Sequence, residues 1–553
     1  MTAKDAETKL LEGEILARFF SRVEPQDHAD IYAIRHLPQE IRATLNGLYS
    51  RSRLSMRETF LRRLSQGLEK QGKGLADLPL GQGVSDEEVL SQVLTDKAGS
   101  FLRTYAIDHG HNSLREGAVL HLAIENVSQL VTRFVQRERR ASFEESSTRY
   151  ISFSKEGHWR DPAVMDAGGE CAKAYEEALD ESFAFYRESI DLVYDHLLNS
   201  RSVPEGEDEK AWKRAAKAEA FDSARYLLTP ALHTKFGIVA DARTISDLVT
   251  QLCSHPLEEF QIVGQRIKAE AESEIPTLLT YAGKNEFLAS NREMERSLAD
   301  ELFASTPTTD DGIREGKMQV TLLESPDNLD ARILASYLYE ESGHPYDEIL
   351  GRVSALSQSE LATLFDRILT QRSSRDAVPE GMEAGGVLDF EVCVDFGAYR
   401  DIGRHRKGFQ QQQRLTTALG YSVPPLFDEA GLGDRYRKTM ESVGEKARMV
   451  AERFPLASGY LIPFAYFQRV RLRFDLRQMA YFVELRSAPD GHFSYRQVAI
   501  EMGDALSEVA PLYARYVKTC REEVLLGRVQ SERNKDDRRK QREERARQLG
   551  FDT

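Results

Sequence analysis

The sequence predicts an α+β fold, richer in helices than in strands, with mixed or antiparallel sheets and two repeats in a pseudo-twofold arrangement. Residues 388–396 alternate apolar and polar side chains with period two, which is typical of a half-buried strand. Long helical patterns cover residues 168–198 and 428–454. Short motifs also recur in the same order in both halves of the chain, which indicates an internal duplication.

The length of the chain predicts more than one domain. At 553 residues it is too long for one hydrophobic core. Residues 304–312, ASTPTTDDG, have the composition of a linker. We therefore predict a first repeat at residues 1–300, a second at 313–525, and a charged tail at 526–553.

Each repeat is predicted to place a strand before a helix. Residues 119–125 predict a strand and 127–140 a helix in the first repeat. In the second, the strand at 388–396 precedes a helix that starts at Ala398 and ends in basic residues. Basic side chains are favoured at a helix C-terminus by the helix dipole. That preference is an alternative explanation for these arginines.

Composition limits the classes of function. Hydrophobic residues make up 41% of the chain and charged residues 29%, as in soluble globular proteins. No apolar run approaches the roughly 20 residues that span a bilayer, so we expect no membrane and a cytoplasmic location. The four cysteines form no CxxC pair, so neither a disulfide framework nor a metal site is predicted.

The net charge of -15 argues against broad binding of nucleic acid. The tail at residues 528–547 interleaves basic and acidic residues without an apolar stripe. A solvated or fraying helix, or disorder, is the expected state. RNA binding through this tail is the weaker alternative.

Residues 137–150, RERRASFEESSTRY, form the most informative segment. Arginines are followed here by a loop rich in hydroxyl side chains. Guanidinium groups bind phosphate in a bidentate manner, and hydroxyl groups donate to the remaining oxygens. The segment therefore predicts a pocket for a phosphorylated small molecule, and the alternative is a solvated charge run after a helix.

Three landmarks carry the duplication. Their offsets of 233, 267 and 234 differ by loop insertions, which cost little. Chance matching of short motifs is the alternative. The landmark pairs are Gly110-His111 with Gly343-His344, Arg137-Glu138-Arg139 with Arg404-His405-Arg406, and Asp241-Ala242-Arg243 with Asp475-Leu476-Arg477.

Residues 137–150 resemble the signature of flavin-dependent thymidylate synthases, the ThyX-like family. That signature reads Arg-His-Arg, seven residues, then Ser, with Arg-Tyr closing the loop. Here Arg137 and Ser147 keep this spacing, and Arg149 and Tyr150 close the loop. Residues 110–116 resemble the family element near the flavin, and Ala224-Arg225 resembles a nucleotide-binding element.

The resemblance implies site residues in both repeats. Arg486, nine residues after Arg477, occupies the position of the arginine that activates deoxyuridylate and is the predicted catalytic residue. The residues predicted to bind dUMP are Arg137, Glu145, Ser147, Thr148, Arg149, Tyr150 and Arg225. The residues predicted to bind the cofactor are His111, Ser113, Arg137, Arg139, Arg404, His405, Arg406, Asp475 and Arg477.

The two repeats depart from the family in complementary ways. Repeat one has Leu252 where the activating arginine belongs, and repeat two has residues 410–413, QQQQ, in place of the nucleotide loop. We therefore expect one site to draw on both repeats. The other departures from the family motifs are Gly117 for a histidine, Phe134 for a glutamine, Glu138 for a histidine, and Asp241 and Asp475 for an asparagine.

The resemblance implies conversion of dUMP to dTMP with FAD, and with methylenetetrahydrofolate and NADPH as co-substrates. Family members are homotetramers, so two duplicated chains are expected to form a homodimer that is a pseudo-tetramer. The motif departures leave an alternative open. In that alternative the chain is a silent or substrate-altered paralogue, which binds nucleotide or flavin as a regulatory or scaffold subunit.

Overall fold

The computed structural model describes residues 3–21, 31–81, 83–148, 153, 157–203, 208–303, 314–373 and 376–522, with residues 529, 533, 537, 541 and 542. Two compact units divide the chain. The first contains Met1–Ile124, Arg140–Glu145 and Lys235–Ser305, and the second contains Glu125–Arg139, Ser146–Thr234 and Thr306–Thr553. The predicted linker at 304–312 and most of the tail lie outside the described residues. The predicted domain boundaries therefore stay predictions.

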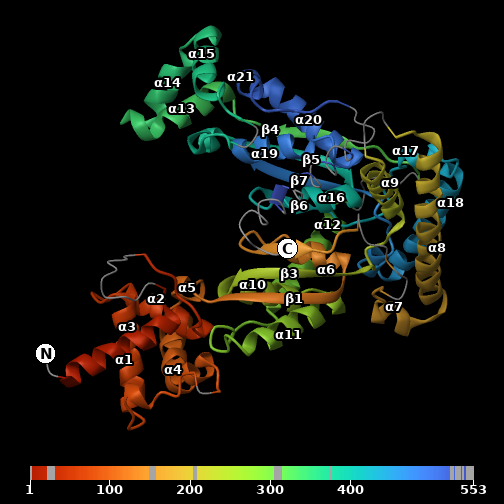
Figure 1. Cartoon of the computed structure of the whole chain (residues 1–553). Coiled ribbons are helices and arrows are strands. Elements are labelled where there is room, and N and C mark those ends of the chain that lie inside the picture. Colours follow the sequence, from red (N-terminus) through yellow and green to blue (C-terminus); the bar gives the residue numbers. More distant parts are fainter. Residues whose placement is uncertain are drawn as a thin grey trace. The chain divides into compact units, whose positions relative to one another are not determined.

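The first unit begins with a helical bundle (Figure 1). Its helices enclose an apolar core that includes Phe19, Leu45, Phe60 and Leu90. Capping boxes at Ser55 and Ser85 start two of the helices by satisfying their first free N–H groups. The helices are α1 (Ala3–Phe19), α2 (Gln39–Tyr49), α3 (Met56–Glu69), α4 (Asp86–Leu102) and α5 (Asn112–Arg115), with a π-helical turn at Arg103–Asp108.

A three-stranded sheet follows, with strand order β1-β3-β2. It comprises β1 (Val119–Ser128), whose end belongs to the second unit, β2 (Ser142–Glu145) and β3 (His233–Asp241). Two packed helices follow β3, namely α10 (Ala242–Cys253) and α11 (Glu258–Glu272). Helix α12 (Glu286–Phe303) closes the first unit.

The second unit contains a four-stranded antiparallel sheet of order β4-β5-β7-β6. Its apolar face, which includes Phe390 and Leu472, packs into the core of the unit, and Arg471 on the other face pairs with Asp389. This alternation confirms the predicted strand. The strands are β4 (Gln319–Glu324), β5 (Val387–Asp395), β6 (Phe409–Gln412) and β7 (Phe467–Asp475).

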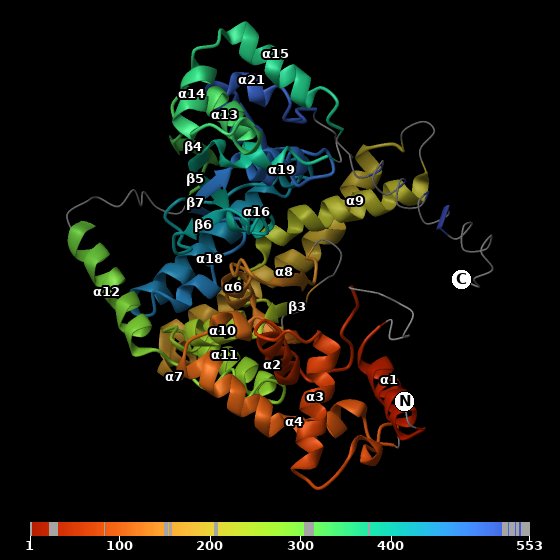
Figure 2. The same cartoon turned by 90° about the vertical axis from the view of Figure 1, so that its left-hand side faces the viewer.

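Helices cover the apolar face of this sheet, and several of them gather at one end (Figure 2). They are α13 (Leu329–Ser342), α14 (Tyr346–Ser354), α15 (Gln358–Leu369), α16 (Phe396–Ile402), α19 (Leu476–Arg486), α20 (Phe493–Val509) and α21 (Pro511–Ala514). The other helices of the unit are α6 (Gln129–Val135), α7 (Pro162–Ala167), α8 (Gly169–Ser200), α9 (Glu209–Ala224), α17 (Pro425–Glu429) and α18 (Gly433–Arg453). 3-10 turns occupy Leu75–Asp77, Arg225–Leu227, Glu380–Gly385 and Ala457–Tyr460.

The two sheets repeat one topology, because β1-β3-β2 has the same order as β5-β7-β6. The register agrees as well. Ser142 pairs with Val239, and the residues at the corresponding offsets, Phe409 and Arg473, also pair. The helix after each strand starts at an equivalent capping residue, Ser128 or Asp395. These matches support the predicted duplication and confirm the α+β fold.

The predicted helices after these strands are too long. Helix α6 ends at Val135 and α16 at Ile402, so Arg139 and Arg406 lie in turns and not at helix ends. In each repeat the backbone turns back after seven helical residues and enters a short strand, β2 or β6. The basic residues therefore belong to a turn, and a helix dipole does not explain them.

Counterparts from the two repeats meet within the second unit. The N–H of Ala231 donates to the carbonyl of Tyr460 at 2.9 Å, and the N–H of Ala465 donates to the carbonyl of Tyr226 at 3.2 Å. Exchanging the repeats converts one bond into the other, which is the signature of a twofold axis. The equivalent long helices α8 and α18 also pack against each other (Figure 1).

Candidate functional site

Two equivalent arginines, Arg133 on α6 and Arg400 on α16, mark the local twofold axis of the second unit. Nη1 of Arg133 donates to the carbonyl of Arg400 at 3.0 Å, across 267 residues of sequence. Nη2 of Arg133 also donates to the side-chain oxygen of Gln136 at 2.5 Å. Both arginines are buried. Sequence reasoning missed them, although the 267-residue offset relates them.

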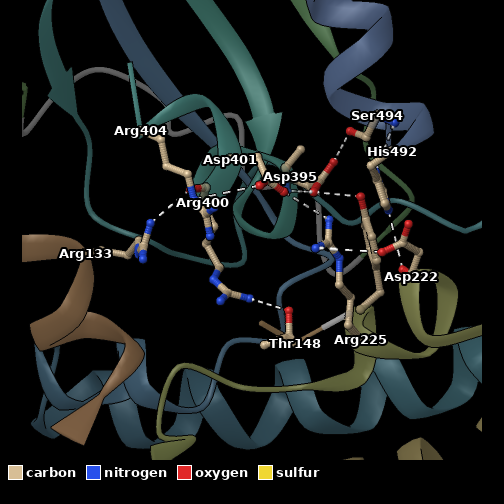
Figure 3. Close-up of polar contacts among 12 residues, drawn as sticks. Arg133, Thr148, Asp222, Arg225, Asp395, Arg400, Asp401, Arg404, His492 and Ser494 are labelled. Carbon is tan, nitrogen blue, oxygen red and sulfur yellow. Dashed lines mark hydrogen bonds and ion pairs between the residues drawn. The ribbon is translucent and has the colours of Figure 1, made fainter. Parts of the chain in front are cut away.

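Arg400 connects the second repeat to the predicted nucleotide loop of the first. Its Nη1 donates to Oγ1 of Thr148 at 2.9 Å, and both side chains are buried (Figure 3). Ser147, next in the loop, is half-buried. Arg149 and Tyr150, both predicted to bind dUMP, lie outside the described residues. Thr148 of this loop is therefore anchored by a residue of the other repeat.

Arg225 lies at the start of a 3-10 turn after α9 and is 2% exposed. Two carboxylates flank its guanidinium group. Asp222 lies at 4.0 Å and Asp401 at 3.6 Å, and Asp401 also lies 3.9 Å from Arg404 (Figure 3). Asp401 occupies the position in repeat two that Phe134 holds in repeat one. The structure thus places Arg225 of repeat one beside α16 of repeat two.

A buried carboxylate, Asp395, organises the side of this cluster next to Arg225. It accepts hydrogen bonds from the hydroxyl group of Tyr226 at 2.8 Å, the N–H of Ala398 at 2.7 Å and the hydroxyl group of Ser494. Burial raises the pKa of the Asp395 carboxyl, and these hydrogen bonds oppose the shift. The ring of Tyr226 stacks on His492 with centroids 5.3 Å apart. Residue 226 is therefore fixed, and with it the backbone next to Arg225.

Arg486, the predicted catalytic residue, is the last residue of α19. Its Nε donates to Nε2 of His405 at 2.8 Å, and its guanidinium carbon lies 5.3 Å from the centroid of the Tyr495 ring. Nδ1 of His405 lies 3.0 Å from the side-chain nitrogen of Gln478. Glu484, two residues before Arg486, pairs with Arg372 and not with Arg486. The histidine and the arginine predicted from separate motifs are thus in direct contact.

Cationic side chains next to the four-stranded sheet could hold an anionic dinucleotide. Arg404, Lys407 and Arg477 keep 46%, 45% and 36% of their side chains exposed. Glu383 pairs with Lys407 and Arg477. Partly exposed cations of this kind fit the diphosphate of FAD. Asp475, also predicted to contact the flavin, caps α19 through the N–H of Gln478 at 2.7 Å.

Arg139 of the first repeat contacts the second repeat, whereas Arg137 contacts an aromatic ring of its own repeat. Nε of Arg139 donates to the carbonyl of Arg406 at 3.2 Å, and its Nη2 donates to the carbonyl of Lys407 at 2.7 Å. The guanidinium of Arg137 lies 4.7 Å from the centroid of the Phe134 ring. The motif Arg137-Glu138-Arg139 and its counterpart Arg404-His405-Arg406 therefore adjoin each other at the local twofold.

The remaining predicted residues belong to the first unit. His111 and Ser113 are exposed at the start of α5, and Glu145 is half-buried in β2. A β-carbon at Gly117 would lie 3.1 Å from Cα of Ala43, so α2 occupies the space that a histidine would need. This packing accounts for the missing histidine of the motif.

The second unit thus brings the predicted Thr148, Arg225 and Arg404 into one cluster with side chains that were not predicted (Figure 3). The latter are Arg133, Arg400, Asp222, Asp395 and Asp401. Among the residues that the structure describes, no group of three His, Cys, Asp or Glu residues could hold a metal ion. No helix in the described ranges is long and apolar enough to cross a membrane.

Curated proteins and solved structures are similar to this chain over different shares of its length. The UPF0159 protein of Chlamydia muridarum is 27% identical over 96% of this chain and 99% of its own. The UPF0159 protein of Thermoplasma acidophilum is 26% identical over 76% of this chain and 89% of its own. The UMP/dUMP methylase PolB from Streptomyces cacaoi, solved with 5-Br dUMP, covers 37% of this chain at 13% identity, with a TM-score of 0.29.

Shorter relatives match only part of the chain. The flavin-dependent thymidylate synthase of Clostridium tetani is 25% identical over 36% of this chain and 76% of its own. The family model described as thymidylate synthase complementing protein matches two segments, residues 70–277 and 354–512. These segments cover more than half of the chain and correspond to the two repeats. The chain therefore belongs to the thymidylate synthase complementing protein family as a tandem member.

Proposed function

We propose that this chain is a flavin-dependent methyltransferase that converts dUMP to dTMP, with methylenetetrahydrofolate as carbon donor and NADPH as reductant. The observation that carries the proposal is the bond between Arg400 and Thr148, because it joins the nucleotide loop of one repeat to the other repeat. Each repeat alone lacks part of the family motif. A joint site restores the set. We also propose a homodimer equivalent to a tetramer of single-repeat chains, because this chain carries two repeats.

The charge of the cluster suits a nucleotide phosphate. Arg133, Arg225, Arg400 and Arg404 outnumber the three carboxylates Asp222, Asp395 and Asp401, even when all three are ionised. A phosphate monoester carries a charge of about -1.5 to -2 at neutral pH. An excess of guanidinium groups therefore favours phosphate, and each charge-assisted contact contributes roughly 1.5–3 kcal/mol.

Arg486 is the proposed catalytic residue. Methyl transfer to C5 of the pyrimidine requires negative charge to develop on the ring oxygens and N3. A fixed guanidinium aimed at that charge stabilises the transition state by about 3 kcal/mol. The hydrogen bond from Nε to His405 fixes one edge of the group and leaves the two Nη atoms to donate elsewhere. Because the role proposed for Arg486 is electrostatic stabilisation of this charge, it needs no enzyme nucleophile.

We assign Arg404, Lys407 and Arg477 to the diphosphate of FAD because they combine positive charge with partial exposure. When bound, reduced flavin supplies the electrons that turn a methylene group into a methyl group. Asp475 is only an acceptor while ionised, and its oxygen already caps α19. It therefore orients the start of α19 beside these cations.

The first test is whether the purified protein carries a flavin, which gives a yellow colour and a visible absorption band. The second is release of tritium from C5-labelled dUMP when reduced flavin and methylenetetrahydrofolate are supplied. Release that depends on both reduced flavin and methylenetetrahydrofolate supports the proposal. Binding of dUMP and flavin without release would favour the silent paralogue, and release from UMP but not dUMP would favour an altered substrate.

A further inference from the structure

We infer that His405 is a positioning residue for Arg486, and that its neutral ring orients the guanidinium group without cancelling its charge. The inference rests on the proposed function for the role of Arg486. It assigns His405 a task different from direct contact with the flavin, which the motif alone implies.

The hydrogen-bond pattern fixes the tautomer of His405. Arginine has only donors, so Nε2 of His405 must accept the bond from Nε of Arg486 at 2.8 Å. A neutral imidazole then carries its proton on Nδ1. The side-chain nitrogen of Gln478 lies 3.0 Å from Nδ1, and a 180° turn of this amide puts its oxygen there, where it accepts from Nδ1–H. Gln478 therefore holds the histidine in the accepting tautomer.

The surroundings keep the ring neutral. His405 is 5% exposed and packs edge-on against Phe482 with centroids 4.9 Å apart. Burial lowers the pKa of His405 to about 3, and the positive charge of Arg486 contributes to this shift. Asp401 opposes the shift and Arg406 adds to it. A ring that is neutral at physiological pH can accept the hydrogen bond from Arg486.

Arg486 differs in this respect from other arginines of the same unit. Arg372 is held by both oxygens of Glu484 at 2.7 Å, and Arg471 is paired with Asp389. Each of those charges is compensated by a carboxylate. Within the described residues, the contacts of Arg486 are His405 and the face of Tyr495. A guanidinium oriented by a neutral acceptor keeps its whole charge for the developing oxyanion.

The test compares His405→Gln with His405→Glu in the full-length protein. Glutamine keeps a neutral acceptor, so we expect turnover to fall by less than about tenfold. Glutamate places an anion on Arg486, so we expect kcat to fall by about 100-fold or more. The dissociation constant for dUMP should stay within about threefold in both variants. The same two changes at His196, on α8, are the matched control and should leave turnover unchanged.

A His405→Glu variant that turns over as fast as His405→Gln would overturn the inference, because charge would then be irrelevant. Equal losses of kcat and dUMP affinity in both variants would also overturn it, since they indicate a purely structural residue. Retained thermal unfolding midpoints would show that both variants fold.

A readout independent of activity separates this inference from the proposed function. In the protein labelled with 15N-histidine, His405 is identified as the signal lost in His405→Gln among the 12 histidines. We expect a neutral, Nδ1-protonated ring from pH 5 to 8, and a less uniform tautomer in Arg486→Leu. An imidazolium or an Nε2-protonated ring in the wild type would overturn the inference. Absence of tritium release with the expected tautomer would count against the proposed function alone.

Discussion

The turn after α6 and the turn after α16 are built alike but carry different chemistry. Both follow a strand and a seven-residue helix, and both lead into a four-residue strand of the same register. Repeat one has Glu138 where repeat two has His405. Repeat one has Thr148 in its loop, and repeat two supplies the Arg400 that binds it.

This comparison indicates that the two repeats keep the same backbone geometry while their side chains at the candidate site differ. Hydrogen bonds between strands use backbone groups and tolerate many side chains, and serine and aspartate are both good helix N-caps, so both copies keep this geometry. A joint site needs each functional group only once. One copy of a group can then change, as Leu252 has at the position equivalent to Arg486.

The largest expected effect is on catalysis and tests whether repeat two supplies the active arginine. Arg486→Lys keeps the charge but loses the planar group that donates to His405. We expect kcat to fall by about 100-fold, with the dissociation constant for dUMP changed by less than about threefold. Tritium release and equilibrium binding measure the two quantities.

The control is Arg372→Lys, which changes an arginine of the same unit that is compensated by Glu484. It should lower the thermal unfolding midpoint and leave kcat per folded molecule close to the wild-type value. Full tritium release by Arg486→Lys would remove this residue from the mechanism. It would also contradict the prediction that repeat two supplies the catalytic arginine.

The second effect is on stability and compares the equivalent capping residues. Ser128 caps α6 through the N–H of Val131, whereas Asp395 caps α16 and also accepts from Tyr226 and Ser494. We expect Ser128→Ala to cost about 1 kcal/mol and Asp395→Ala about 3 kcal/mol. Denaturant unfolding followed by fluorescence measures both, and equal costs would show that the extra bonds of Asp395 add nothing.

The fold could be predicted from sequence where periodicity is local. The alternation in residues 388–396 predicted β5, and the long helical pattern at 168–198 predicted α8. The lengths of α6 and α16 could not be predicted, because basic residues extend a helical pattern into the turn. The end of each helix depends on pairing of β2 and β6 with distant strands, which a local pattern does not contain.

The third effect is on nucleotide affinity and tests whether the repeats share one site. Thr148→Val removes the hydroxyl that accepts from Arg400 and leaves a buried donor without this partner. A hydrogen bond to a charged group contributes roughly 1.5–3 kcal/mol, so dUMP affinity should fall about tenfold. Isothermal titration measures it.

Thr417→Val is the matched control, since Thr417 accepts from Arg448 at 2.9 Å in a similar threonine–arginine bond. Its dUMP affinity should equal that of the wild type. Equal losses in both variants would indicate a general effect on stability and would contradict a shared site at Thr148.

The candidate site was predictable only in part. Motif spacing identified Arg225, His405 and Arg486, but it did not pair His405 with Arg486, which are 81 residues apart. Arg133 and Arg400 were missed because a buried arginine in a helical segment has the same sequence pattern as a surface one. Applying the 267-residue offset to each residue would have paired them, although their contact needs the local twofold.

The smallest expected effect concerns the two equivalent aspartates that replace the family asparagine. Asp241 accepts from the N–H of Thr244 at 2.8 Å, and Asp475 accepts from the N–H of Gln478 at 2.7 Å. Asparagine caps a helix about as well as aspartate, so each Asp→Asn change should alter the free energy of unfolding by less than about 0.5 kcal/mol.

Asp475 also lies 3.6 Å from Lys407, one of the cations assigned to FAD. Asp475→Asn frees that charge and restores a donor, so we expect FAD affinity to rise about threefold, as measured by flavin fluorescence. Asp241→Asn serves as the matched change in repeat one and should leave FAD affinity unchanged. An equal rise in both variants would show that the gain in FAD affinity does not come from releasing Lys407, and it would contradict the assignment of that cation to FAD.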